Sequence, residues 1–238
     1  MAPIHFGCLV YDYQAIDVLG PTDVLNSSSK LYMQAMSSIT GAKQETIDRA
    51  PEFVFHHVGI SLEPVALASS SMSMVPTTTV DDCPELDCLL IGGPDPVNFE
   101  LHPKFADLIR RHAAAGKLIF TNCTGSMVLA STGVLDGKNA TINNVAYSIM
   151  TQKYPNVKWT IGKKWVVDGN IWTAGGAVAG MDMFSHWIKE NFGLDVLSVG
   201  ASLLDFEPRD IDGVVSVIPK RFDENGKPLS TYVFGSGS

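Results

Sequence analysis

Short apolar runs recur along the chain and alternate with segments whose apolar residues follow helical spacing. Runs of strand length cover residues 3–10, 53–60, 86–91 and 117–122. Helical spacing marks residues 103–115 and 177–192 as amphipathic helices. Apolar strands that alternate with helices indicate a parallel sheet covered on both faces. We therefore expect an α/β fold, a three-layer sandwich with a mostly parallel central sheet.

Proline and glycine positions predict the connections. Pro21 suits the first position of a helix, so we expect a loop up to Gly20 and a helix from Pro21 to about Met36. Asp168-Gly169-Asn170 predicts a hairpin turn between strands over residues 159–167 and 171–173. Further elements are expected as a polar connection with some helix over 37–50, a hairpin over 62–76, a turn and hairpin at 133–138, an edge segment over 140–144 and a helix over 147–154.

One domain over residues 1–207 accounts for this pattern, with residues 208–238 as a C-terminal extension. The chain has 238 residues, of which 45% are hydrophobic, enough for the core of one large α/β domain. After Glu207 the sequence is typical of an extended, mobile tail, and the final residues 235–238 resemble a linker.

Charge and cysteine content exclude some classes of binding partner and indicate a cellular compartment. A net charge of −8 without a basic cluster argues against nucleic acid and against an anionic membrane surface, but leaves a small-molecule substrate open. No signal peptide or spanning segment is evident, so we expect a cytoplasmic protein with reduced cysteines. Cys83 and Cys88 lack the spacing of a zinc site, and no metal is expected.

Cys123 lies where a β-type run changes into helical spacing. A strand, a sharp turn and a helix would present its side chain at the carboxyl edge of the sheet, as in a nucleophile elbow with Cys in place of Ser. The N–H groups at the start of the following helix would favour the thiolate. This stretch alone is equally compatible with a buried core cysteine.

Two other strand ends favour a functional Cys123. Asp17 follows the first strand, and Gly92 and Gly93 follow the central strand, where glycines allow close backbone approach to a ligand. Carboxyl ends of parallel strands meet at one edge, where sites form. We expect Asp17, Gly92-Gly93 and Cys123 to converge there. His186 on the last helix is expected to be structural.

Four stretches carry a resemblance to a known family: Ile16-Asp17-Val18-Leu19-Gly20-Pro21, Leu89-Leu90-Ile91-Gly92-Gly93, Cys123-Thr124-Gly125-Ser126 and Thr173-Ala174-Gly175-Gly176. They resemble the DJ-1/PfpI superfamily, with its flavodoxin-like, class I glutamine amidotransferase-like fold. The acid Asp17 and the residue Thr124 after the cysteine are most similar to the isonitrile (cyclohexyl isocyanide) hydratase branch. That resemblance implies a functional trio of Cys123, Asp17 and Thr124, a homodimer and no cofactor.

The resemblance implies cysteine-dependent hydration of isonitriles to N-substituted formamides, a hydro-lyase reaction. Cys123 would attack the isonitrile carbon, Asp17 would shuttle protons, and Thr124 with N–H groups near Gly93 would stabilise charge. Asn143 and Asn144 stand where these hydratases differ, and we expect them to bind substrate and alter its range. Thr121 stands where related elbows often carry glycine.

Two alternatives stay open. One is a glyoxalase- or deglycase-like enzyme that acts on α-oxoaldehydes through a hemithioacetal at Cys123. The other is a non-catalytic, redox-sensing dimer in which Cys123 is oxidised. Peptide hydrolysis is not expected, because no His is placed beside Cys123 to activate it and to protonate an amine leaving group. A regulator is not expected either, because no helix-turn-helix segment is evident after residue 200.

Overall fold

The computed structural model describes residues 2–69, 71–218, 221, 223–227 and 229; the expected linker at 235–238 lies outside them. The main strands are β1 (Ile4–Leu9), β2 (Phe53–Gly59), β5 (Thr78–Thr79), β6 (Cys88–Ile91), β7 (Leu118–Asn122), β10 (Trp165–Asp168) and β11 (Ile171–Ala174). Within the described chain these seven strands form one sheet in the order β10-β11-β7-β6-β1-β2-β5. Only β10 among them runs antiparallel to its neighbour.

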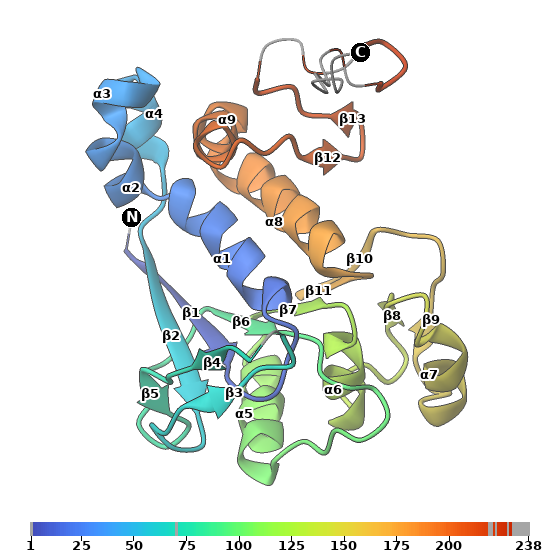
Figure 1. Ribbon diagram of the computed structural model, residues 1–238. Helices are drawn as coiled ribbons and strands as arrows, with labels where there is room; N and C mark the ends of the chain where they lie inside the picture. Colours follow the sequence, from blue (N-terminus) through green and yellow to red (C-terminus); the bar gives the residue numbers. More distant parts are fainter. Residues whose placement is uncertain (1, 70, 219–220, 222, 228, 230–238) are drawn as a thin grey trace, which may run out of the picture.

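Helices cover both faces of this sheet. The helices of the described chain are α1 (Ile16–Ser27), α2 (Lys30–Ala35), α3 (Ser37–Thr40), α4 (Gln44–Arg49), α5 (Pro103–Ala114), α6 (Gly125–Ser131), α7 (Tyr147–Lys153), α8 (Ala177–Phe192) and α9 (Leu194–Leu203). Figure 1 shows α1 and α8 side by side on one face, with α5 and α6 on the other. The expected three-layer α/β sandwich with a mostly parallel sheet is therefore confirmed.

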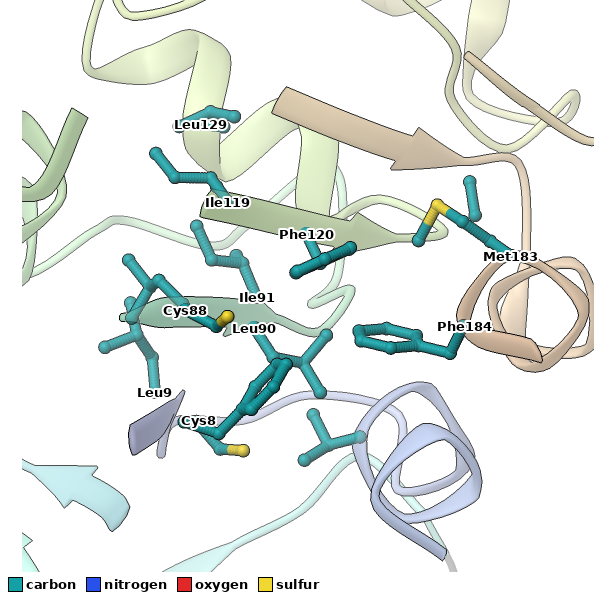
Figure 2. Packing of buried hydrophobic residues seen from close by; sticks show 14 of the residues in the cluster. Cys8, Leu9, Cys88, Leu90, Ile91, Ile119, Phe120, Leu129, Met183 and Phe184 are labelled. Carbon is teal, nitrogen blue, oxygen red and sulfur yellow. The ribbon is translucent and has the colours of Figure 1, made fainter. Parts of the chain in front are cut away.

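The core lies on both sides of the central strands β1, β6 and β7. Every residue of β6 is buried, which explains its unbroken apolar sequence. Phe120 on β7 packs against Phe184 on α8 with ring centroids 4.5 Å apart, and against Phe6 on β1 at 6.0 Å. Figure 2 shows Phe120 and Phe184 on one side of the sheet and Leu129 on the other. This packing holds the ends of β1, β6 and β7 at one edge.

The helix expected to start at Pro21 begins five residues earlier. Backbone N–H groups from Asp17 onward already donate to carbonyls one turn back, so α1 starts at Ile16 and Pro21 lies inside it. The expected single helix to Met36 is also broken after Ser27, because Ser29 caps a separate helix α2 through its hydroxyl. Asp17 therefore lies in the first turn of a helix and not in a loop.

Smaller strand pairs test the expected hairpins. The one at 62–76 is confirmed as antiparallel β3 (Val65–Ala66) and β4 (Ser73–Met74), and the one at Asp168-Gly169-Asn170 joins β10 to β11. The strand expected over 159–167 is instead split between β9 (Lys158–Trp159) and β10, because Gly162 takes a left-handed φ of 76°. The hairpin expected at 133–138 is wrong: turns there lead to β8 (Asn139–Ala140), which pairs in parallel with β9.

The start of the C-terminal extension packs onto α8. Its short hairpin consists of β12 (Arg209–Asp210) and β13 (Gly213–Val214). The carboxylate of Asp210 accepts hydrogen bonds from His186 Nδ1 at 2.7 Å and Lys189 Nζ at 2.5 Å. This contact gives His186 a structural partner and holds the first residues after Glu207 against the domain. The expected boundary at residue 207 stays a prediction.

Candidate active site

Cys123 lies at the apex of a sharp turn between β7 and α6. Its φ of 56° is left-handed, a conformation that a residue with a side chain rarely adopts. Gly125 makes the turn possible, since a Cβ there would lie 3.0 Å from the Gly92 carbonyl oxygen and closer still to that of Ile91. The strand–turn–helix geometry expected for a nucleophile elbow is present, and the thiol is half-buried at the sheet edge rather than enclosed in the core.

Asp17 is a fully buried carboxyl held by several neighbours. Its N–H donates to the Gln14 carbonyl at 2.9 Å, and its Oδ2 accepts from the Gly93 N–H at 2.9 Å. Its other carboxyl oxygen, Oδ1, has no hydrogen-bond partner among the described residues. Burial raises the pKa of Asp17 to about 6, and the Gly93 N–H opposes that rise only in part. Near neutral pH, this carboxyl can both accept and release a proton.

Gly93 brings the acid and the nucleophile turn together. A Cβ on Gly93 would lie 2.8 Å from Asp17 Oδ2, 2.5 Å from Thr124 Oγ1 and 2.7 Å from Thr124 N. Only a glycine allows this approach. The Gly93 N–H, expected to hold substrate, donates to Asp17 in this structure, and substrate binding by Gly92 and Gly93 stays a prediction. The Gly92 carbonyl is also occupied, by the hydroxyl of Tyr11 at 2.6 Å.

The sulfur of Cys123 has two kinds of neighbours with opposing effects. Burial and the nearby Asp17 carboxylate raise the pKa of the Cys123 thiol, whereas hydrogen bonds from Thr124 and Asn143 lower it. The balance is a raised pKa, so the expected lowering by the helix start does not prevail. Desolvation and a like charge outweigh the N–H donors. The resting sulfur is a thiol whose ionisation depends on the charge of Asp17.

The Asn143 side chain is oriented by its own loop. Its Oδ1 accepts from the Val145 N–H at 3.0 Å, which points the Nδ2 amide at Cys123 Sγ, 3.3 Å away. Asn144 is exposed, and no hydrogen bond joins it to the cysteine among the described contacts. Thr124 is buried and donates its hydroxyl to the Pro94 carbonyl at 2.7 Å. The edge segment expected over 140–144 thus contacts the sulfur through one of its two asparagines.

Two contacts at this site have no signal in the sequence. Asn122 donates its amide to the Asp17 carbonyl at 2.6 Å, and Tyr11 donates to the Gly92 carbonyl. Both bonds end on backbone atoms far away in the chain, which no local pattern specifies. Within the described residues, no group of three or more His, Cys, Asp or Glu side chains is arranged to hold a metal ion.

A cysteine on a left-handed elbow beside a buried carboxyl, at the carboxyl edge of a parallel sheet, defines an α/β protein of the nucleophile-elbow type. A model of the DJ-1/PfpI family matches residues 8–190, and the chain belongs to this family. The fold agrees with a ThiJ/PfpI family protein from Pseudomonas syringae, with a TM-score of 0.68 at 20% identity over 87% of this chain and 77% of that one.

Relatives in this family differ in what they do. The chain is 30% identical over 208 residues to an isonitrile hydratase from Pseudomonas putida, covering 86% of this chain and 79% of the hydratase. It is 25% identical over 140 residues to the HTH-type transcriptional regulator GbdR from Pseudomonas aeruginosa, covering 59% of this chain but only 38% of the regulator. Among the described residues, no helix has both the length and the apolar character that crossing a bilayer requires.

Proposed function

We propose that this protein hydrates isonitriles to N-substituted formamides, with Cys123 as the nucleophile and Asp17 as the proton shuttle. The observation that carries the proposal is the arrangement of these two groups: Cys123 lies on a left-handed elbow whose next residue, Thr124, and the buried Asp17 carboxyl both pack against Gly93. Burial and the Asp17 charge raise the pKa of the thiol, and burial raises the pKa of the carboxyl to about 6. Similarity to the Pseudomonas putida isonitrile hydratase over most of both chains supports the same reaction class.

The first half of the reaction joins the substrate to the enzyme. Asp17 takes the thiol proton, which moves the negative charge onto sulfur, where the donors of Thr124 and Asn143 stabilise it. The thiolate forms a C–S bond to the terminal carbon of R–N≡C. Asp17 returns the proton to that carbon, which gives the thioimidate R–N=CH–S–Cys123 and leaves a carboxylate.

The second half releases the product. Asp17 removes a proton from water as its oxygen adds to the thioimidate carbon, and then passes that proton to nitrogen. The resulting R–NH–CH(OH)–S–Cys123 loses its hydroxyl proton to Asp17 as the C–S bond breaks. The products are R–NH–CHO and a thiolate beside a protonated Asp17, the state in which attack began. One water is consumed, with no net change in the enzyme.

The charge arrangement favours this reaction over peptide hydrolysis. Hydrolysis of an amide requires a base that ends up protonating an amine leaving group, commonly a His beside the cysteine. Thr124 occupies the position after Cys123, and its hydroxyl already donates to Pro94. In isonitrile hydration the leaving group is the sulfur itself, so one carboxyl that exchanges protons near neutral pH is sufficient.

We propose further that the working form is a cytoplasmic homodimer. All four cysteines are free thiols, in keeping with a reducing compartment. Val97, in the loop after Gly93, is 71% exposed, and Val145, next to Asn144, is 91% exposed. In the proposed dimer a second copy covers these two valines, which lie four residues after Gly93 and two residues after Asn143. Light scattering should give twice the chain mass, and a monomer at micromolar concentration would contradict this assembly.

A panel of substrates tests the proposed reaction. Reduced protein is incubated with cyclohexyl isocyanide, with methylglyoxal and with hydrogen peroxide, followed by quantification of N-cyclohexylformamide and lactate and by mass spectrometry of Cys123. The proposal predicts repeated turnover of the isocyanide. Lactate without formamide would instead indicate the α-oxoaldehyde enzyme. Stoichiometric oxidation of Cys123 without either product would indicate a redox sensor.

A further inference from the structure

A buried amide lies directly before the nucleophile and contacts the backbone of the acid. Asn122, the last residue of β7, is fully buried and donates Nδ2 to the Asp17 carbonyl oxygen at 2.6 Å. Its own Oδ1 has no hydrogen-bond partner among the described residues. An unpaired buried oxygen is unfavourable, so packing alone would favour an apolar residue here. The amide therefore calls for another explanation.

Pro21 explains why the Asp17 carbonyl is available to Asn122. In a regular helix this carbonyl would accept from the N–H four residues later, and that residue is Pro21, which has no N–H. The Asn122 amide takes the place of the missing intrahelical donor. A hydrogen bond therefore joins the first turn of α1, which carries Asp17, to the strand that leads to Cys123, across 105 residues of sequence.

A third element fixes the amide in place. A Cβ on Gly180 of α8 would lie 2.5 Å from both Cγ and Nδ2 of Asn122, so the backbone of α8 lies directly against the amide. Contacts from α1, α8 and β7 thus leave the side chain little freedom. The Asp17 carboxyl in turn accepts from Gly93 at the end of β6. The acid is held from both neighbouring strand ends, once through its carboxyl and once through its carbonyl.

We propose that Asn122 is a positioning residue, which sets the place of the Asp17 carboxyl relative to Cys123 by bonding the Asp17 carbonyl to the nucleophile's own strand. Without this bond the first turn of α1 is free to move against β7, and the carboxyl moves with it. Misplacement of a reacting group by about 1 Å can lower a rate by about 100-fold. Only the kinetic readout of this inference rests on the proposed function.

Asn122→Leu tests the proposal, because Leu has nearly the same shape and no donor. We expect kcat for cyclohexyl isocyanide to fall by about 10- to 100-fold with KM within about 2-fold. The matched control is Thr121→Val, which removes an equally buried hydroxyl whose one hydrogen bond among the described residues is to Ser126 Oγ at 2.7 Å. That control should lose stability and keep its kcat.

A substrate-free readout separates this inference from the proposed reaction. The pH dependence of Cys123 alkylation by iodoacetamide gives the thiol pKa in four proteins: wild type, Asp17→Asn, Asn122→Leu and the double variant. In the wild-type background, Asp17→Asn should lower the thiol pKa, because the carboxylate raises it. In the Asn122→Leu background that difference should shrink. An unchanged difference would overturn the positioning role, even if no isonitrile is ever hydrated.

Pro21→Ala distinguishes two roles for Asn122: placing the Asp17 carboxyl, or only donating a hydrogen bond to the Asp17 carbonyl. Ala supplies the missing helical N–H, so Pro21→Ala/Asn122→Leu restores a donor to Asp17 but not the bond to β7. If Asn122 positions Asp17, the double variant should recover thermal stability but should recover neither kcat nor the effect of Asp17→Asn on the thiol pKa of Cys123. Recovery of all three would show a merely structural role and overturn the proposal. If Asn122→Leu does not fold alone, the same comparison is made between Pro21→Ala and the double variant.

Discussion

Replacing Asp17 with Asn should abolish turnover and, at alkaline pH, make the folded protein more stable. The Asp17 side chain is fully buried, and burial raises its pKa from 3.8 to about 6. Above pH 6 the carboxyl is ionised in both the folded and the unfolded protein, so folding places a charge in a poorly solvated site. Below 3.8 it is neutral in both states, and the penalty disappears.

The size of the effect follows from the two pKa values. They differ by about two pH units, and each unit corresponds to about 1.4 kcal/mol. The charged carboxyl therefore destabilises the fold by about 3 kcal/mol above pH 6. This penalty develops as pH rises from 3.8 to 6. Asn keeps an acceptor for the Gly93 N–H and carries no charge, so Asp17→Asn should regain about 3 kcal/mol at pH 8 and almost nothing at pH 4.

Urea unfolding of wild type and Asp17→Asn at pH 8 and pH 4 measures this difference. Cys123→Ala is the matched control, because it alters the same site but keeps Asp17 and should keep the wild-type pH dependence. A variant no more stable than wild type at pH 8, or one equally stabilised at both pH values, would contradict the raised pKa of the buried Asp17 carboxyl. Since the inactive variant is expected to be the more stable one, loss of turnover could not be ascribed to misfolding. We expect that loss to be about 100-fold or more.

Three further outcomes follow from the same geometry. Asp17→Asn should speed alkylation of Cys123 by iodoacetamide at neutral pH, because the charge that raises the thiol pKa is gone, and Asn143→Leu should slow it, because a donor to sulfur is gone. Gly125→Ala should cost about 1–3 kcal/mol in urea unfolding because its Cβ meets two carbonyls, whereas Gly176→Ala, with open space at its Cβ, should be nearly neutral. The Asp210 side chain is buried, but hydrogen bonds from Lys189 and the Ile211 N–H and the contact with His186 outweigh that burial and lower its pKa. The contribution of Asp210 to stability is therefore present above the ordinary pKa of 3.8 and is lost as pH falls through the lowered pKa. Limited proteolysis at pH 7 should cut residues 208–215 faster in Asp210→Asn than in wild type, and equal rates would contradict the contact.

The elements that follow a strong local pattern were predictable from the sequence. The unbroken apolar run of β6 and the amphipathic repeats of α5 and α8 predict those elements to within two residues at either end. The convergence of Asp17, Gly93 and Cys123 was also predictable, because parallel strands place their carboxyl ends at one edge. Local chemistry and strand direction are sufficient for this part of the fold.

The predictions from sequence failed where contacts between residues far apart in the chain determine the structure. Pro21 has the sequence signature of a helix start, but the chain accepts it inside α1 because Asn122 supplies the missing donor. The thiol pKa of Cys123 depends on burial and on a carboxylate 106 positions away in the chain, so the helix N–H groups alone mispredict its direction. Neither effect leaves a trace in the spacing of neighbouring residues.

The role of Cys123 as nucleophile is measured by the rate of N-cyclohexylformamide formation from cyclohexyl isocyanide in wild type and in Cys123→Ala at pH 7. Many turnovers per wild-type chain, with the variant at the uncatalysed rate, are the predicted result. Equal rates in the two proteins, or no formamide from folded, reduced wild type, would contradict the assignment of Cys123 as the nucleophile of an isonitrile hydratase.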